Sequence, residues 1–160
     1  MSVKKIKKDQ QPAPSQEEPK LMNNAHYIKD FSFENPGVLK NISAEEGPNI
    51  NINIHVDVTP LAEDVYEVVI LLNIKADSKG EVLFLVELSY GGIFRIKSGL
   101  DEKEQKQLLL VDAPTLLFPF ARTIVANTTR EGGLPPLLLN PVDFKKLSQQ
   151  AVNKESKVKH

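Results

Sequence analysis

Strict alternation of apolar and polar residues runs through residues 50–58. Every second residue there is β-branched and apolar, and all the intervening residues are polar. Because successive side chains of a strand point to opposite faces of its sheet, this pattern predicts a strand with one buried and one solvated face.

A shorter alternating run, residues 27–34, ends at Asn35-Pro36-Gly37 and predicts an earlier strand that a turn terminates. The parity of this strand puts two carboxylates on one face. It puts three aromatic residues on the opposite face. The carboxylates are Asp30 and Glu34, and the aromatic residues are Tyr27, Phe31 and Phe33.

The next run, residues 65–74, loses the alternation in its middle and predicts a central strand covered on both faces. Polar residues and a glycine at 77–80 predict a hairpin into residues 81–90, so the two strands should pair antiparallel. The adjacent Gly91 and Gly92 predict a bend or bulge before a last extended segment. We therefore expect a twisted antiparallel sheet as the platform of the protein.

The period changes after Gly99, where acidic residues predict a helix that starts at about residue 101 and continues to 111. Asp112-Ala113-Pro114 predicts the start of a second helix, with a stripe of apolar residues facing the core. Prolines keep residues 134–139 extended, and Asn140-Pro141 has the cap and first-turn residues of a last helix. The predicted core stripe consists of Leu116, Leu117, Phe120, Ile124 and Val125.

Composition divides the chain of 160 residues into one domain and two polar ends. We expect residues 1–25 to be a disordered basic extension, residues 26–153 to fold, and residues 154–160 to be a flexible basic tail. Residues 26–144 carry ten basic and seventeen acidic residues, a net charge of −7. Such a body repels nucleic acid and attracts cationic partners.

No apolar core follows the basic start of the chain, so we expect no export signal and a cytoplasmic location. The longest apolar runs are too short to span a bilayer, which argues against membrane insertion. There is no cysteine and no glycine-rich phosphate loop, and the three histidines are scattered. We therefore expect no metal, no cofactor and no use of ATP by this chain.

Two carboxylate arrangements leave an enzymatic alternative open. His55 and Asp57 share a strand face and could form an oriented base, and Asp30 with Glu34 could form an acid/base pair. Either would suit a small hydrolase, although solvated strand faces carry such residues without any chemistry. The surplus of apolar surface favours a different class of function, in which a groove or a subunit interface covers it.

Five blocks of sequence, in order, resemble the SecB family of bacterial protein-export chaperones. They are distributed over roughly residues 26 to 147. The blocks are residues 27–36 (YIKDFSFENP), 64–69 (DVYEVV), 91–94 (GGIF), 117–122 (LFPFAR) and 134–144 (LPPLLLNPVDF).

The resemblance implies an α+β fold, a four-stranded antiparallel sheet with helices packed on one side, assembled as a homotetramer that is a dimer of dimers. It implies a chaperone, not an enzyme, that holds unfolded precursor proteins without ATP and delivers them to the export motor SecA. A SecB-like module dedicated to a single partner is the alternative.

Site residues also follow from the resemblance. The family positions matched by Asp30, Glu34, Leu85 and Glu87 imply the SecA-docking face, and those matched by Val86 and Leu88 imply subunit contacts. Candidates for the client groove are Tyr66, Phe84, Phe94, Leu137, Leu138, Leu139 and Phe144.

Overall fold

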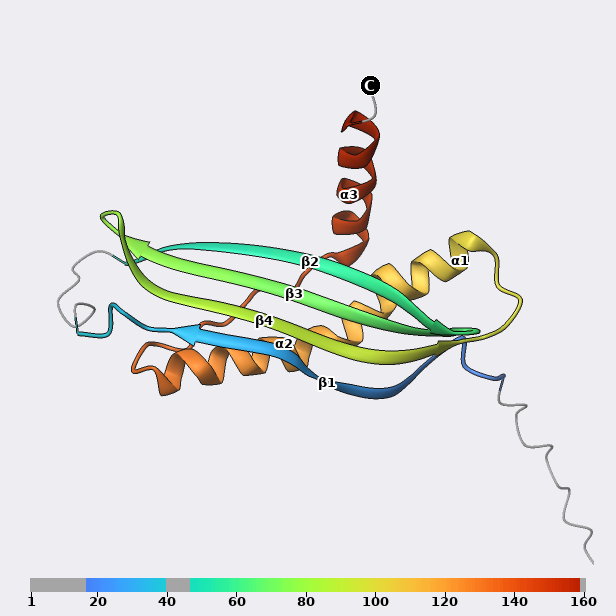
Figure 1. Ribbon diagram of the computed structural model, residues 1–160, viewed down its shortest axis with the longest axis horizontal. Helices are drawn as coiled ribbons and strands as arrows, with labels where there is room; N and C mark the ends of the chain where they lie inside the picture. Colours follow the sequence, from blue (N-terminus) through green and yellow to red (C-terminus); the bar gives the residue numbers. More distant parts are fainter. Residues whose placement is uncertain (1–16, 40–46, 159–160) are drawn as a thin grey trace, which may run out of the picture.

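The computed structural model describes residues 17–39 and 47–158, which form one sheet and a layer of helices. All four strands pair antiparallel in the order β1-β4-β3-β2 (Figure 1), which confirms the α+β class and the predicted sheet. The strands are β1 (Leu21–Glu34), β2 (Asn49–Ala62), β3 (Val65–Ser78) and β4 (Glu81–Ile96).

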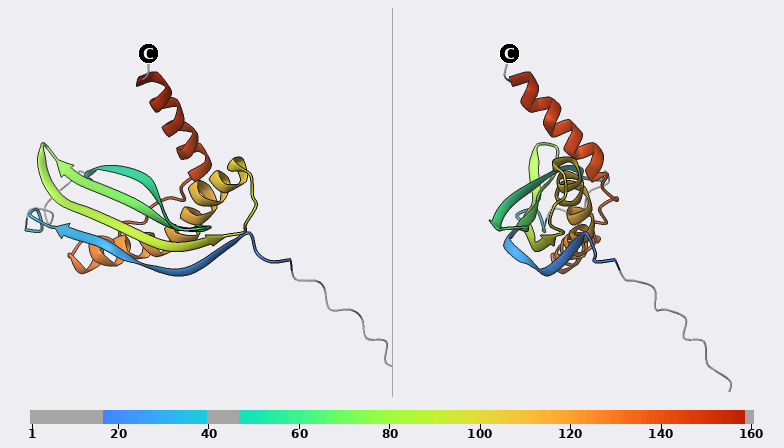
Figure 2. Two further views of the ribbon diagram at one scale, coloured as in Figure 1. Left: turned by 45° about the vertical axis from the view of Figure 1, so that its right-hand side comes forward. Right: turned by 90° about the vertical axis from the view of Figure 1, so that its right-hand side faces the viewer.

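The helices lie on one side of this sheet (Figure 2), and the last of them projects away from it. The first three helical segments run into one another as a single stretch, Glu102–Glu131. The segments are α1 (Glu102–Gln107), the π-helical η2 (Leu108–Asp112), α2 (Ala113–Glu131) and α3 (Phe144–Val158).

The turn between β3 and β4 confirms the predicted hairpin. Lys79 and Gly80 have φ values of 51° and 82°, so both central residues are left-handed. Two such residues make the type I′ turn whose twist matches that of the flanking strands. One register shift follows between Ala76 and Asp77, and beyond it β3 and β4 pair without interruption as far as Val65 and Arg95.

Strand β1 differs from its prediction in its start and in its parity. It begins at Leu21 and so takes in residues 21–25, which were assigned to the extension. Its pairing with β4 shifts between Ile28 and Asp30. This shift leaves one extra residue in β1, which reverses the alternation of its side chains. Tyr27 therefore lies on the face opposite to Phe31 and Phe33, so the predicted aromatic face is wrong at Tyr27.

The glycine pair in β4 does not interrupt the strand. Gly91 and Gly92 pair continuously with Val69 and Val68 of β3, so no bulge occurs at the glycine pair, and the predicted bulge is wrong. A Cβ on Gly92 would lie 2.9 Å from Leu117 Cδ2, and one on Gly91 would lie 3.0 Å from the Tyr27 ring. The glycines are therefore explained by close packing on both faces.

The contact between Gly92 and Leu117 identifies the helix-covered face of the sheet, which carries the even-numbered residues of β4. Leu117, Ala121 and Val125 of α2 are fully buried against it, as part of the predicted stripe requires. Leu116 and Phe120 are exposed instead, because the buried side of α2 is centred on 117, 121 and 125, and these two fall on its flank.

The helix boundaries correct two further predictions. The predicted start of α1 near residue 101 is confirmed, and Asp101 caps the helix in a capping box with Glu104. Asp112, however, is helical and makes no side-chain cap, because the π turn η2 carries α1 directly into α2. Asp143 caps α3, since its Oδ1 accepts the N–H of Lys146 at 3.0 Å, so the predicted start at Asn140 is three residues early.

The 30-residue helical stretch Glu102–Glu131 is long and apolar enough to cross a membrane by length and composition. Its most apolar side packs on the sheet, and the core helix of a globular protein satisfies the same criteria. The C-terminal helix α3 continues through residues 154–158, which were assigned to the tail, and residues 1–16 and 159–160 lie outside the described part of the chain.

Candidate functional site

The outer face of the sheet gathers the four residues expected at the docking face. Register pairs Asp30 with Ser89 and Glu34 with Leu85, and Glu87 lies opposite Ser32. Directly paired residues of antiparallel strands point to the same side, so all four share the face away from the helices. We call Asp30, Glu34 and Glu87 the acidic row.

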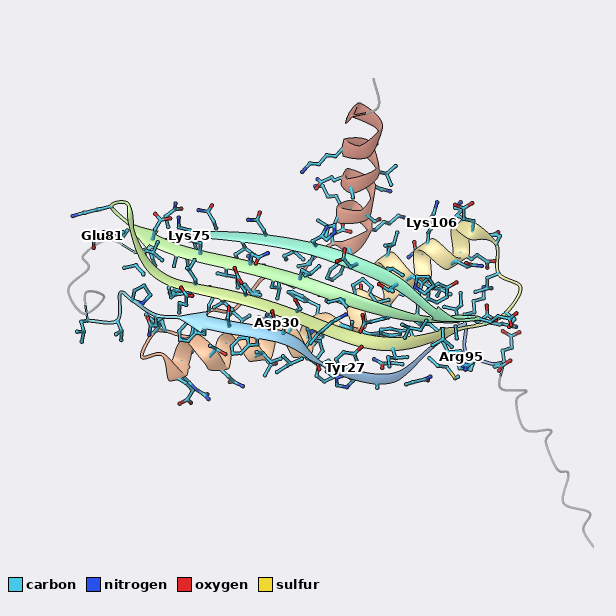
Figure 3. The ribbon with its side chains drawn as sticks, viewed as in Figure 1. Tyr27, Asp30, Lys75, Glu81, Arg95 and Lys106 are labelled. Atoms are coloured by element: carbon cyan, nitrogen blue, oxygen red, sulfur yellow. The ribbon has the colours of Figure 1, made fainter. Side chains whose placement is uncertain are left out.

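The acidic row keeps its charges uncompensated. No ion pair joins Asp30, Glu34 or Glu87 to another residue in the described part of the chain. The only hydrogen bond described for these carboxylates is the one that Asp30 Oδ1 accepts from the N–H of Phe31. Lys75 lies across from Leu85, toward the hairpin end of the sheet (Figure 3), and forms no ion pair with the row. The face therefore presents net negative charge.

A further carboxylate on this face, Glu67, is neutralised locally. Its Oε1 accepts a hydrogen bond from Lys29 Nζ at 2.6 Å, and its Oε2 accepts one from the Tyr27 hydroxyl. The Lys29 hydrogen bond, followed by that of Tyr27, holds the pKa of Glu67 below its ordinary value. Burial, followed by the hydrogen bond to Glu67, raises the pKa of Tyr27 to about 12. This triad fixes β1 beside its bulge.

The residues expected at subunit contacts lie on the opposite, helix-covered face. Val86 and Leu88 are almost fully buried within the single chain and pair with Ile74 and Leu72 of β3. The single chain therefore already covers both side chains, and their part in subunit contacts stays a prediction.

Exposed apolar side chains do occur where β1 meets α2. His26 stacks on Phe120 with ring centroids 4.3 Å apart, and its Nδ1 lies 2.5 Å from the Tyr90 hydroxyl, so the two elements touch. The β1–α2 patch, as we call it, consists of Ile28, Phe31, Leu116 and Phe120.

A groove lies on the far side of α2 from the β1–α2 patch, between that helix and the extended residues 134–143. Its volume is about 460 Å³, and most of its lining is apolar. The lining residues are Thr115, Phe118, Pro119, Arg122, Thr123, Ala126, Leu138, Pro141, Val142 and Phe144.

Two of the predicted groove residues, Leu138 and Phe144, line this groove. Leu138 is 64% exposed, whereas Phe144 is buried and forms the floor with Phe118, whose ring centroid lies 5.9 Å away. The other five do not line it. Phe84, Phe94 and Leu139 are buried in the core, and Tyr66 and Leu137 are partly buried against it.

The extended wall of the groove is held by side chains of α2. Thr129 is fully buried, and its Oγ1 accepts the N–H of Leu137 at 2.9 Å while donating to the carbonyls of the preceding turn. Arg122 donates from Nε to the Leu139 carbonyl at 2.7 Å. The apolar periodicity of this segment does not point to Arg122, although it is the only charged residue between positions 113 and 129.

The residues of the enzymatic alternative are open to solvent. His55 Nε2 lies 2.9 Å from Asp57 Oδ1, so the pair forms, but the two side chains are 68% and 57% exposed on the edge strand β2. Asp30 and Glu34 lie on the open sheet face. Within residues 17–39 and 47–158, no group of three or more His, Asp or Glu residues is placed to hold a metal ion.

The model of the family "Preprotein translocase subunit SecB" matches residues 14–155. The Protein-export protein SecB of Sinorhizobium fredii is 47% identical over 142 residues, covering 88% of this chain and 85% of the relative. That of Paramagnetospirillum magneticum is 48% identical over 136 residues, covering 84% of this chain and 86% of the relative.

A solved structure shares the fold. It is the Mycobacterium tuberculosis Rv1957 SecB-like chaperone in complex with a ChAD peptide from the antitoxin HigA1, with a TM-score of 0.65 and 15% identity. It matches 77% of this chain and 91% of its own. From the family model and the two relatives, the chain belongs to the SecB family of protein-export chaperones.

Proposed function

We propose that this chaperone holds apolar segments of unfolded precursor proteins in the groove beside α2 and presents them to the export motor SecA through the acidic row. The observation that carries the proposal is the separation of the two surfaces. An apolar groove and an uncompensated acidic row lie on opposite sides of one sheet, so both can be occupied at once.

Groove binding suits a chaperone that accepts many clients. Burying one large apolar side chain contributes about 1.5 to 3 kcal/mol, and ordering the client offsets much of it. A single groove is therefore weak, but several grooves on one assembly bind one long chain tightly. No nucleotide chemistry is needed, and the sequence has no phosphate loop.

A homotetramer, built as a dimer of dimers, would supply the several grooves. The β1–α2 patch supports this assembly, since it exposes two apolar residues of an edge strand and two of a helix, and the two elements touch through His26 and Phe120. Unpaired edges and apolar flanks are the surfaces that subunits cover. Assembly would be in the cytoplasm, where precursors emerge before export.

The test separates the two surfaces by substitution. Leu138→Ser, in the groove, should weaken capture of a chemically unfolded protein about tenfold and leave SecA affinity unchanged. Asp30→Asn combined with Glu34→Gln should weaken SecA binding, steeply so at low salt, and leave client capture unchanged. Calorimetry would measure both affinities, and light scattering the assembly mass.

A variant that loses both client capture and SecA binding would contradict the separation of the two surfaces. If both variants keep both activities, the groove and the acidic row do not have the proposed roles. The dedicated-module alternative is not favoured, because the relatives are named for protein export. It predicts capture of one partner only, whereas the proposed function predicts capture of several unrelated unfolded proteins and none of their folded forms.

A further inference from the structure

One guanidinium group lies in the otherwise uncharged groove. Among the described residues that line the groove, Arg122 is the only charged one, and its Nε–H donates to the Leu139 carbonyl at 2.7 Å. That bond fixes one edge of the planar group against the groove wall. The remaining part of the guanidinium is thereby given a defined orientation at low entropic cost.

The remaining donors of Arg122 are unsatisfied by the protein. A guanidinium carries five N–H donors, and neither Nη group makes a hydrogen bond or ion pair with any residue in the described ranges. The Arg122 side chain is exposed, so water can reach these donors in the open groove. When an apolar segment displaces that water, the segment must supply acceptors or the buried donors will oppose binding.

We propose that Arg122 recognises the main chain of the client by donating from its Nη groups to a backbone carbonyl of an extended apolar segment. An apolar segment carries no carboxylate, but every residue of it carries a carbonyl. Recognition of that group does not depend on the client sequence. The inference rests on the proposed function, because it names the polar contact within the same groove.

Part of the groove wall, at Leu134 and Leu137, is anchored independently of Arg122, so the contribution of Arg122 can be separated from that anchor. The backbone N–H of Leu134 donates to the Thr129 carbonyl at 3.1 Å, and that of Leu137 donates to Thr129 Oγ1. Truncating Arg122 leaves both bonds in place. Arg130, on the same helix, is a matched control because, among the residues that the structure describes, its side chain pairs only with Glu131, at the surface and outside the groove lining.

The experiment measures binding of two labelled apolar peptides to the full chain by fluorescence anisotropy. The peptides are equal in length, and only one contains a glutamate. Arg122→Met should weaken both by about tenfold, the loss expected for one charge-assisted hydrogen bond. Arg122→Lys should weaken both by less, because an ammonium still donates, and Arg130→Met should change neither.

Three results would overturn the inference. They are an unchanged affinity in Arg122→Met, a loss confined to the glutamate peptide, and an equal loss in Arg130→Met. The hydrogen-exchange rate of the Leu137 amide distinguishes loss of a contact between Arg122 and the peptide from loosening of the groove wall. This rate should rise in Thr129→Val and stay unchanged in Arg122→Met. If Leu138→Ser leaves peptide binding intact, the proposed client groove is refuted. If Leu138→Ser weakens binding but Arg122→Met does not, the groove stands and only the inference about Arg122 fails.

Discussion

The two faces of the sheet are held by different forces, although they share the same four strands. On the helix-covered face, Val68, Ile70 and Leu88 are buried against α2 and its neighbours, and packing decides which side chain fits. On the outer face, the acidic row stays in water and one triad, centred on Glu67, joins β1 to β3 across β4. Substitutions should therefore cost most on the first face and depend on pH and salt on the second.

The largest effect is expected from Leu117→Ala on the helix-covered face. Leu117 is fully buried, and removing its side chain leaves a cavity that should lower the free energy of unfolding by about 3 kcal/mol. Urea unfolding at fixed protein concentration measures it.

The neighbouring Leu116 provides the matched control. It is 51% exposed on the β1–α2 patch, so Leu116→Ala should cost less than about 1 kcal/mol within the subunit. If the patch is a subunit interface, Leu116→Ala should instead change how the midpoint of urea unfolding depends on protein concentration. Equal costs for the two leucines, measured at high concentration, would contradict the placement of α2.

A smaller difference should separate the two adjacent glycines of β4. The Cβ of Gly92→Ala would meet Leu117 Cδ2 at 2.9 Å and the Ala25 carbonyl oxygen at 3.2 Å, so overpacking should cost about 2 kcal/mol. In Gly91→Ala the Cβ meets only the edge of the Tyr27 ring at 3.0 Å, and the cost should be smaller.

Thermal unfolding of the two glycine variants measures this comparison. A larger cost for Gly91→Ala would mean that the outer face is the more tightly packed of the two. It would also mean that the Tyr27 ring is held too firmly by Glu67 to move aside.

Sequence alone predicted the outer face better than the helix-covered one. Alternation within β1 placed Asp30 with Glu34, because both lie beyond the bulge, but it misplaced Tyr27, which lies before it. No local pattern reveals a bulge, since it depends on the partner strand. Family resemblance supplied Leu85 and Glu87, and the register places them on the same face.

The groove was harder to predict because its residues come from segments that tertiary packing brings together. An apolar residue such as Phe94 or Leu138 reads the same in a sequence, yet one is fully buried and the other is exposed. The flank position of Leu116 likewise depends on how α2 is rotated over the sheet. Arg122 could have been noticed as a single charged residue in an otherwise uncharged helical segment, but arguments from apolar periodicity do not use that information.

The smallest expected effect lies on the outer face and depends on pH. Lys29 and Tyr27 hold the pKa of Glu67 below 4.5, so the triad stabilises the fold above about that pH and loses its contribution as pH falls through the lowered value. Because Lys29 is half exposed, the contribution should be about 1 kcal/mol.

Glu67→Gln should therefore be less stable than the wild type at pH 7, and the difference should shrink toward pH 3. Glu34→Gln removes a carboxylate of the same face that forms no ion pair among the described residues, and its difference from the wild type should stay small throughout. A constant difference between Glu67→Gln and the wild type in urea unfolding at pH 3, 5 and 7 would mean that shape, and not charge, holds β1 at its bulge.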